Sequence, residues 1–370
     1  MSPSLRRASR ALCAIAYGMA AYVMVAAHAA AQGMPPQLAQ FLQQTAGLST
    51  NDIRAVASGS ALVKSLKVSD SREIALLGVV RINVPRSYYV QRVTDFASSL
   101  HQPSRTGLGI FSDPAVASDV AAFSLSHDDV KNLANCRPGD CKLKLPAQSI
   151  TQLRASIDLK SPQADSVATA YVHARMVDYV TAYRARGDAA LVTYDDSKDT
   201  TAAVQVWDAM LSQTPYIYQY APELDQYLKN YPNDRPPGAR EAIYWALDDM
   251  SGGQPTLTVN DEIVSESPAR PNATFVMSKQ LFSDHYLDGG LDLTAILDQA
   301  SDSSGAPSGA TPGIYVVMLR RLHFDNLPSG GLLNIRGRVI GKLTDVTKTL
   351  LGDAKTQNEH DYAGRPAASH

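Results

Sequence analysis

The stretch FVMSKQLFSDHYLDGGLDLTAILD, residues 275 to 298, decides the fold that the sequence predicts. In its second half, an apolar row made of Leu291, Leu293, Ala295 and Leu297 alternates with Asp292, Thr294, Ile296 and Asp298. This period of two indicates a β-strand with one buried face. Asp288-Gly289-Gly290 is typical of a tight hairpin turn. The stretch therefore predicts two antiparallel strands, 275–287 and 291–298, joined by that turn.

The sheet extends beyond this hairpin in both directions along the chain. Alternation recurs at 257–263 and at 314–324, and the Val-, Leu- and Ile-rich segments 61–68 and 74–84 predict two earlier strands. After the last strand the apolar spacing becomes helical, with Leu332, Ile335, Val339, Leu343, Val346 and Leu350 three or four residues apart. We therefore expect a long C-terminal helix that packs one face on the sheet.

The predicted fold class is α+β, with an antiparallel sheet and a long C-terminal helix in a helix-grip-like arrangement. Residues 32–370 are expected to form one elaborate domain, in which 100–240 is a mainly helical insertion and the polar segment 352–370 a frayed tail. Within the C-terminal helix, Gly337 and Gly341 each cost about 1 kcal/mol of helix propensity. We expect another group to approach the helix closely there, and contact with a strand is favoured over contact with a ligand or membrane.

The first 31 residues are typical of a secretory signal peptide. Three arginines precede an apolar run from Ala11 to about Ala27, and Ala29-Ala30-Ala31 supplies small residues for cleavage near Ala31. An uncleaved anchor is the alternative, because this apolar run approaches the shortest length that spans a bilayer. Cleavage is favoured, which predicts a periplasmic or secreted protein without a stable transmembrane anchor.

Cys136 and Cys141 flank a Pro138-Gly139 turn and are expected to form a structural disulfide in an exported chain. Their spacing differs from the two intervening residues of a thioredoxin-like motif, and no further Cys or His cluster completes a zinc site. The predicted chain therefore holds neither a metal nor a cofactor. Lys and Arg total 34 against 36 Asp and Glu, a balance that argues against nucleic acid as a partner.

Cations interrupt the apolar rows of two predicted strands. Alternation places Lys279 and His285 in a row with Phe275 and Met277, and it places Arg320 in a row with Val316 and Met318. Because an unpaired buried charge is costly, we expect a cavity with polar groups at its wall. Two alternatives stay open: pairing with acids such as Asp261, Glu262 or Asp284, and extension of the long side chains to water at the end of the sheet.

Several short motifs resemble a group of exported bacterial envelope proteins of unknown function. They are Tyr244-Trp245, the segment 278–282, His285-Tyr286 and the Cys136 to Cys141 turn. More distantly, the element order of 256–351 is similar to the helix-grip fold of START-type and birch-pollen-allergen-type lipid-binding domains, with 79–96 as a beginning and 100–240 as a departure. The first resemblance implies an envelope location, and the second implies a ligand cavity beside the C-terminal helix.

The sequence thus predicts non-catalytic binding of an amphipathic, lipid-like small molecule between the sheet and the C-terminal helix. Lys279, His285 and Arg320 would meet its polar end, whereas its apolar wall would include Phe275, Met277, Val316 and Met318. One alternative is an envelope hydrolase or isomerase that uses His285 with carboxylates from another strand. The other is a structural or assembly partner in the cell envelope that uses exposed Tyr216, Tyr218 and Tyr220.

Overall fold

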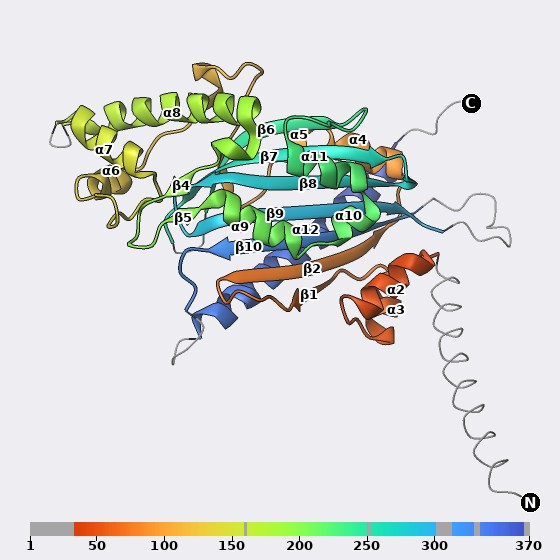
Figure 1. Cartoon of the computed structure of the whole chain (residues 1–370). Coiled ribbons are helices and arrows are strands. Elements are labelled where there is room, and N and C mark those ends of the chain that lie inside the picture. The colour runs from red at the N-terminus through yellow and green to blue at the C-terminus, as the bar shows by residue number, and fades with distance from the viewer. Residues whose placement is uncertain (1–32, 159–160, 250–252, 301–312, 329–333, 366–370) are drawn as a thin grey trace, which may run out of the picture.

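The computed structural model describes residues 33–158, 161–249, 253–300, 313–328 and 334–365. The expected signal peptide, Leu332 of the expected C-terminal helix and the end of the expected tail lie outside the described residues. Within the described part, the centre of the molecule is an eight-stranded antiparallel sheet (Figure 1). Its order is β1-β2-β10-β9-β8-β7-β6-β3.

The strand bounds show that early and late segments share this sheet. They are β1 (Leu62–Leu66), β2 (Glu73–Ile82), β3 (Arg105–Ile110), β6 (Arg240–Asp248), β7 (Thr256–Ser267), β8 (Arg270–Ser283), β9 (Leu287–Asp298) and β10 (Ile314–Phe324). Strand β10 pairs with both β2 and β9, so the last strand of the chain lies beside one of the first. Together with the C-terminal helix α12 (Ile335–Ala363), the sheet confirms the predicted α+β class.

Helices cover both faces of the sheet. We call the face that carries Leu77, Phe275 and Val317 the front face, and the face that carries Val80, Ile296 and Val316 the back face. The front is covered by α2 (Pro36–Gln44), α3 (Thr50–Ala57), α8 (Ala164–Arg186), α9 (Ala203–Ser212), α10 (Tyr216–Tyr220) and α11 (Pro222–Asn230), and the back by α4 (Arg86–Val93), α5 (Phe96–Ser99) and α12 (Figure 1). Both faces of the sheet are therefore buried.

The segment 100–240 contributes a strand as well as helices. Its remaining elements are η1 (Ala117–Val120), α6 (His127–Leu133), α7 (Ala147–Ser156), η2 (Gly187–Ala190), β4 (Thr193–Tyr194) and β5 (Thr201–Ala202). Strand β3 pairs with β6 and forms one edge of the central sheet. The segment is thus largely helical but is joined to the sheet by hydrogen bonds.

The expected hairpin turn at Asp288-Gly289-Gly290 is wrong. Strand β8 ends at Ser283 and β9 begins at Leu287, so the turn occupies 284–286, with Tyr286 at a φ of 58°. Gly289 lies inside β9, where an added Cβ would stand 2.9 Å from Val206 Cγ1 of α9. Gly289 is needed because it permits the close approach of α9. In the sequence, a glycine required for such packing looks the same as a glycine in a turn.

Helix α12 continues well beyond the point where the tail was expected to fray, so the expectation of a frayed segment from 352 onward is wrong. Glu359 Oε1 accepts a hydrogen bond of 2.8 Å from Asn83 N, and Arg92 Nη1 lies 2.8 Å from Asp361 Oδ2. The Tyr362 and Tyr88 rings are 5.0 Å apart. The polar residues of this segment bind groups on the back face, so their polarity does not prevent helix formation.

The expected close approach at Gly337 and Gly341 is also wrong. A Cβ at Gly341 would meet no described atom within 4 Å, and the nearest atoms at Gly337 belong to Asn334, which caps the helix. The tight contact lies instead on strand β2, where a Cβ at Gly78 would stand 2.6 Å from Leu351 Cδ1. Helix α12 therefore reaches the sheet because the strand, and not the helix, lacks a side chain.

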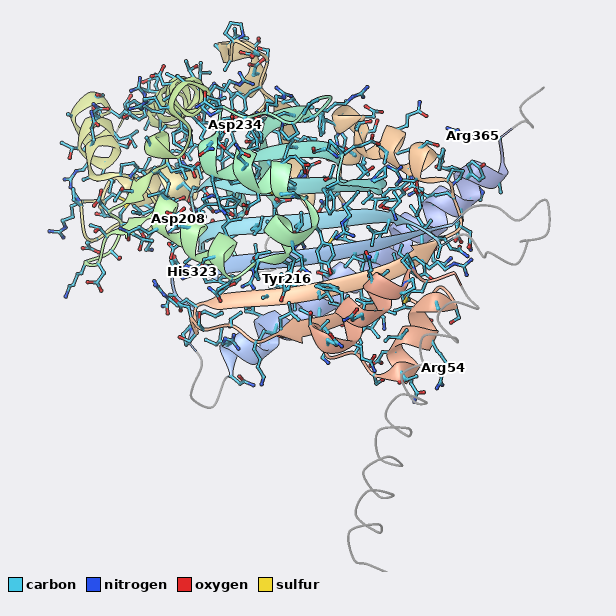
Figure 2. The ribbon with its side chains drawn as sticks, turned by 45° about the vertical axis from the view of Figure 1, so that its right-hand side comes forward. Arg54, Asp208, Tyr216, Asp234, His323 and Arg365 are labelled. Atoms are coloured by element: carbon cyan, nitrogen blue, oxygen red, sulfur yellow. A yellow bond between two sulfur atoms is a disulfide. The ribbon has the colours of Figure 1, made fainter. Side chains whose placement is uncertain are left out.

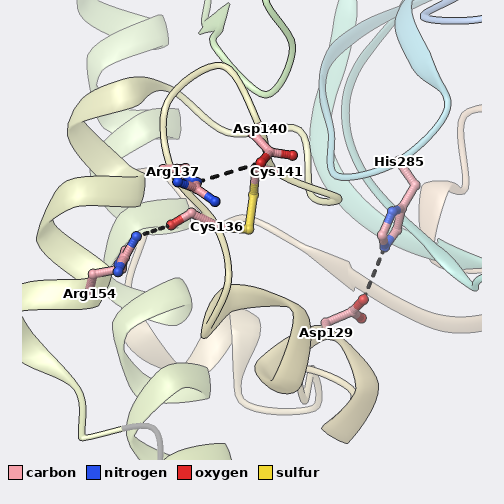
Figure 3. Close-up of a disulfide and its surroundings, with 7 residues drawn as sticks. All are labelled: Asp129, Cys136, Arg137, Asp140, Cys141, Arg154 and His285. Atoms are coloured by element: carbon pink, nitrogen blue, oxygen red, sulfur yellow. Dashed lines mark hydrogen bonds and ion pairs between the residues drawn. A yellow bond between two sulfur atoms is a disulfide. The ribbon is translucent and has the colours of Figure 1, made fainter.

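Cys136 and Cys141 form the expected disulfide, with their Cα atoms 4.3 Å apart (Figure 3). Arg154 Nη1 donates a hydrogen bond of 2.7 Å to the carbonyl oxygen of Cys136, which fixes the turn to α7. Closing so short a loop contributes about 2 kcal/mol on the chain-entropy account.

Among the described residues, no helix combines the length and the hydropathy needed to cross a bilayer.

The contact between Gly78 and Leu351 generates a matched pair of substitutions. Gly78→Ala should lower the free energy of unfolding by about 1 to 3 kcal/mol, because the new Cβ overpacks against a buried leucine. Gly341→Ala should raise it by up to about 1 kcal/mol, because alanine favours the helix and space is open there. Urea unfolding of both variants measures these changes, and equal effects at the two positions would contradict the assigned contact.

Candidate ligand site

Lys279, His285 and Arg320, which were expected to meet the polar end of one ligand, do not lie together. Strand register places Lys279 opposite Leu291, which itself lies opposite Arg321, so Lys279 faces the front. Arg320 is the neighbour of Arg321 and therefore points to the back face. His285 lies in the turn after β8. Alternation placed Lys279 with Phe275 and Arg320 with Val316 correctly, but the strand ends before His285. Alternation does not determine the relative facing of two strands, so the expected meeting of the three cations at one ligand was wrong.

Lys279 is 1% exposed and lies under the front helices. Its ammonium group forms an ion pair with Asp188 and stands 4.2 Å from the ring centroid of Trp207. Burial lowers the pKa of Lys279, and the Asp188 carboxylate opposes that shift. The positive charge of Lys279 is thus balanced by a carboxylate within the protein.

Arg320 and His285 also have carboxylate partners. Arg320 Nη2 lies 2.6 Å from Asp292 Oδ2, and its Nε lies 2.9 Å from Asp292 Oδ1, which makes a bidentate pair. His285 Nε2 lies 3.2 Å from Asp129 Oδ1 of α6 (Figure 3). The carboxylate thus comes from a helix, not from another strand. All three cations are therefore paired with acids, as one of the two alternatives expected. Their partners differ from the expected Asp261, Glu262 and Asp284.

An apolar cavity of about 120 Å³ lies on the front face, between the sheet and the helices α2 and α10. Its sheet wall is built by β2, β8, β9 and β10, through Leu77, Ala273, Phe275, Leu293, Ala295, Leu297, Val317 and Leu319. Of the expected ligand residues, Phe275 lines this cavity and Met277 does not. Val316 and Met318 pack on the back face instead. The cavity is therefore on the side of the sheet opposite α12.

Aromatic side chains close the helical wall of this cavity. The Phe41 ring of α2 lies 5.1 Å from the Tyr216 ring and 6.2 Å from the Tyr220 ring, in edge-to-face contacts. Tyr216 and Tyr220 are four residues apart on α10, so they share one face of that helix (Figure 2 labels Tyr216). Both are half-buried, whereas the Tyr218 side chain lies outside the described part of the structure.

A polar cavity of about 280 Å³ adjoins the apolar one. Its wall shares Gln37, Phe41, Tyr220 and Arg270 with the apolar cavity and adds Gln40, Gln44, Thr45 and Gln219. Sequence reasoning missed this site. A signal was present, because glutamines at 37, 40 and 44 recur at helical spacing and border Phe41.

Arg270 stands at the junction of the two cavities. Its Nη1 donates a hydrogen bond of 2.8 Å to Gln37 Oε1, and its guanidinium carbon lies 5.2 Å from the centroid of the Tyr220 ring. These two contacts hold a half-buried guanidinium in one position. The junction therefore combines an apolar space, neutral amides and one fixed positive charge.

A second polar cluster lies where β9 begins and β10 ends. Lys144 Nζ is 2.7 Å from Asp288 Oδ1, and His323 contacts Asp288 through Nδ1 at 3.1 Å and Asp70 through Nε2 at 3.3 Å. Figure 2 labels His323 at this end of the sheet. Because carboxylates occupy both ring nitrogens, His323 has no nitrogen free to act as a base toward a substrate.

Two buried carboxyl groups have raised pKa values in the folded state. Burial raises the pKa of Asp284 to about 7, although neighbouring His285 opposes the shift. Burial also raises the pKa of Asp261 well above its usual value, and the nearby Glu241 carboxylate adds to this effect. Tyr183 Oη donates a hydrogen bond of 3.0 Å to Asp261 Oδ2. Because both pKa values are raised by folding, these groups stabilise the folded state more at acidic than at neutral pH.

Removing the charge of Lys279 should destabilise the fold. Lys279→Met is expected to lower the free energy of unfolding by about 3 kcal/mol, because Asp188 loses its partner in a largely buried environment. The double variant Lys279→Met, Asp188→Asn should recover part of that loss, because no carboxylate is left unpaired. Urea unfolding provides both values, and a double variant no more stable than the single one would contradict this pairing.

Asp284 should make stability depend on pH. The folded state keeps its proton up to about pH 7, whereas an unfolded aspartate releases it near pH 4, so the free energy of unfolding should fall as pH rises between those values. Asp284→Asn retains an acceptor for the Leu257 N–H and cannot ionise. Thermal unfolding from pH 4 to 8 should therefore show a shallower decline in this variant. An identical decline in both proteins would refute the assignment.

Comparison with known proteins supplies no relative from which a function follows. No protein-family model matches this chain, and no curated protein matches it either. The functional conclusion therefore depends on the chemistry of the two adjoining cavities.

Proposed function

We propose that this chain is an exported, non-catalytic protein that binds an amphipathic, lipid-like small molecule. The observation that carries the proposal is an apolar cavity that adjoins a polar cavity at Arg270, Gln37, Phe41 and Tyr220. An amphipathic molecule requires these two environments side by side, since its apolar part gains by leaving water and its polar part needs hydrogen-bond partners.

The dimensions of the cavities bear on the size of the ligand. The apolar cavity of about 120 Å³ is close to the engineered cavity of about 150 Å³ that binds benzene in another protein. Its occupant is thus a ring or a short alkyl group. With the polar cavity included, the space reaches the lower part of the range of about 300 to 1,000 Å³ found for small-molecule sites.

The place of the proposed site differs from the one expected. The sequence suggested a cavity beside the C-terminal helix, as in START-type domains, whereas this cavity lies under α2 and α10 on the front face. The fold-level resemblance therefore supports binding only in a general way. Export is supported by the composition of residues 1–31 and by the disulfide between Cys136 and Cys141.

A neutral amphiphile tests this proposal. Octanamide should give a saturable one-to-one isotherm in titration calorimetry with protein purified without detergent. Ala295 lines the cavity, so Ala295→Phe should fill the space and weaken octanamide binding at least about tenfold. Ala185→Phe is the matched control, because Ala185 is exposed on α8 and lines neither cavity.

Folding of each variant is checked by a cooperative thermal transition. Equal octanamide affinity in Ala295→Phe and the unmodified protein would place binding outside this cavity and would refute the proposed site. Absence of saturable octanamide binding in the unmodified protein would contradict binding of a neutral amphiphile.

A further inference from the structure

We propose that the natural ligand is an anionic amphiphile, whose oxyanion binds Arg270 while its apolar group enters the cavity under α2 and α10. This inference rests on the proposed function and specifies the ligand class for the same site. The proposed head group is a carboxylate, because a planar guanidinium can donate two parallel N–H groups to a carboxylate.

The charge balance of the two cavities supports an anion. Of the described residues that line either cavity, Arg270 alone carries a charge, and the others are apolar, aromatic, amide or hydroxyl side chains. Among these lining residues there is no carboxylate to repel a negatively charged head group. An ammonium head group would meet the Arg270 charge and be repelled by it.

Arg270 also differs from the cations inside the fold. The fully buried Lys144, Lys279 and Arg321 pair with Asp288, Asp188 and Glu73, respectively. Arg270 takes part in no ion pair with any residue that the structure describes, and its hydrogen bond there goes to the neutral amide of Gln37. A half-buried guanidinium without a carboxylate partner is suited to accept one from a ligand.

The guanidinium is held ready for this role. The Tyr220 ring lies beneath it and the Gln37 amide fixes one nitrogen, so binding an oxyanion requires little further ordering of the side chain. Only Nη1 is engaged by Gln37, so the guanidinium retains further N–H groups that can donate to an oxyanion. The Gln44 and Gln219 amides on the wall of the polar cavity offer N–H donors to the same head group, whereas the Gln40 amide donates to Gln44 Oε1 at 3.2 Å.

Three ligands with the same chain length test the charge. Octanoate, octanamide and octylammonium are titrated separately by calorimetry at pH 7 and low ionic strength. Octanoate should bind at least about tenfold more tightly than octanamide, since a charge-assisted hydrogen bond is stronger than a neutral one. Octylammonium should bind more weakly than octanamide, and added salt should reduce the octanoate preference.

Arg270→Gln should abolish the preference for octanoate and retain octanamide binding, which also shows that the variant is folded. Arg270→Lys should keep part of the preference, because it retains a charge without the planar pair of donors. Arg175→Gln is the matched control. Arg175 also lies over a tyrosine ring, 5.5 Å from the centroid of Tyr171, but it lines neither cavity, so the octanoate preference should be unchanged.

The outcomes separate this inference from the function on which it rests. Equal affinities for octanoate and octanamide in the unmodified protein would overturn the anionic ligand and leave amphiphile binding intact. An octanoate preference that survives Arg270→Gln would overturn the role of Arg270. Binding of none of the three ligands would overturn the proposed function, and the inference with it.

Discussion

Burial of the sheet on both faces is the constraint on which the rest of this structure depends. An antiparallel sheet often leaves one face in water, but here α2, α3 and α8 to α11 cover the front and α4, α5 and α12 the back. A charged side chain on either face therefore lacks water and needs a partner within the protein. The pairs of Lys279 with Asp188 and of Arg320 with Asp292 satisfy this need on opposite faces.

Arg270 differs from these paired cations because no described carboxylate pairs with it. Lys279, Arg320 and Arg321 each pair with a carboxylate inside the protein. Arg270 is the first residue of β8 and stands at the border of an apolar and a polar space. Its aromatic and amide neighbours orient the guanidinium without neutralising it. Charge, orientation and access thus coincide at a single residue.

Much of the fold could be predicted from the sequence, because alternation and helical spacing are local. The strands containing Phe275 and Val316 and the helix containing Leu351 were predicted from such patterns. The facing of Lys279 relative to Arg320 could not be predicted, because it depends on register between distant strands. The turn was wrongly predicted at Gly289 for a similar reason. This residue lacks a side chain so that α9 can pack closely, and no local sequence pattern shows such a contact. Arg270 was missed because α2 completes its surroundings.

The composition of the cavity wall has a consequence for biogenesis. Its residues come from the start of the described chain, at Leu38 and Phe41, and from strands that end at Phe324. A nascent polypeptide cannot enclose this space until β10 has been synthesised, so the pocket is among the last features to assemble. Contacts between such remote segments slow folding, because a long loop must close first. A ligand that bridges α2 and the late strands would favour the closed chain, and it would thereby act as a folding template.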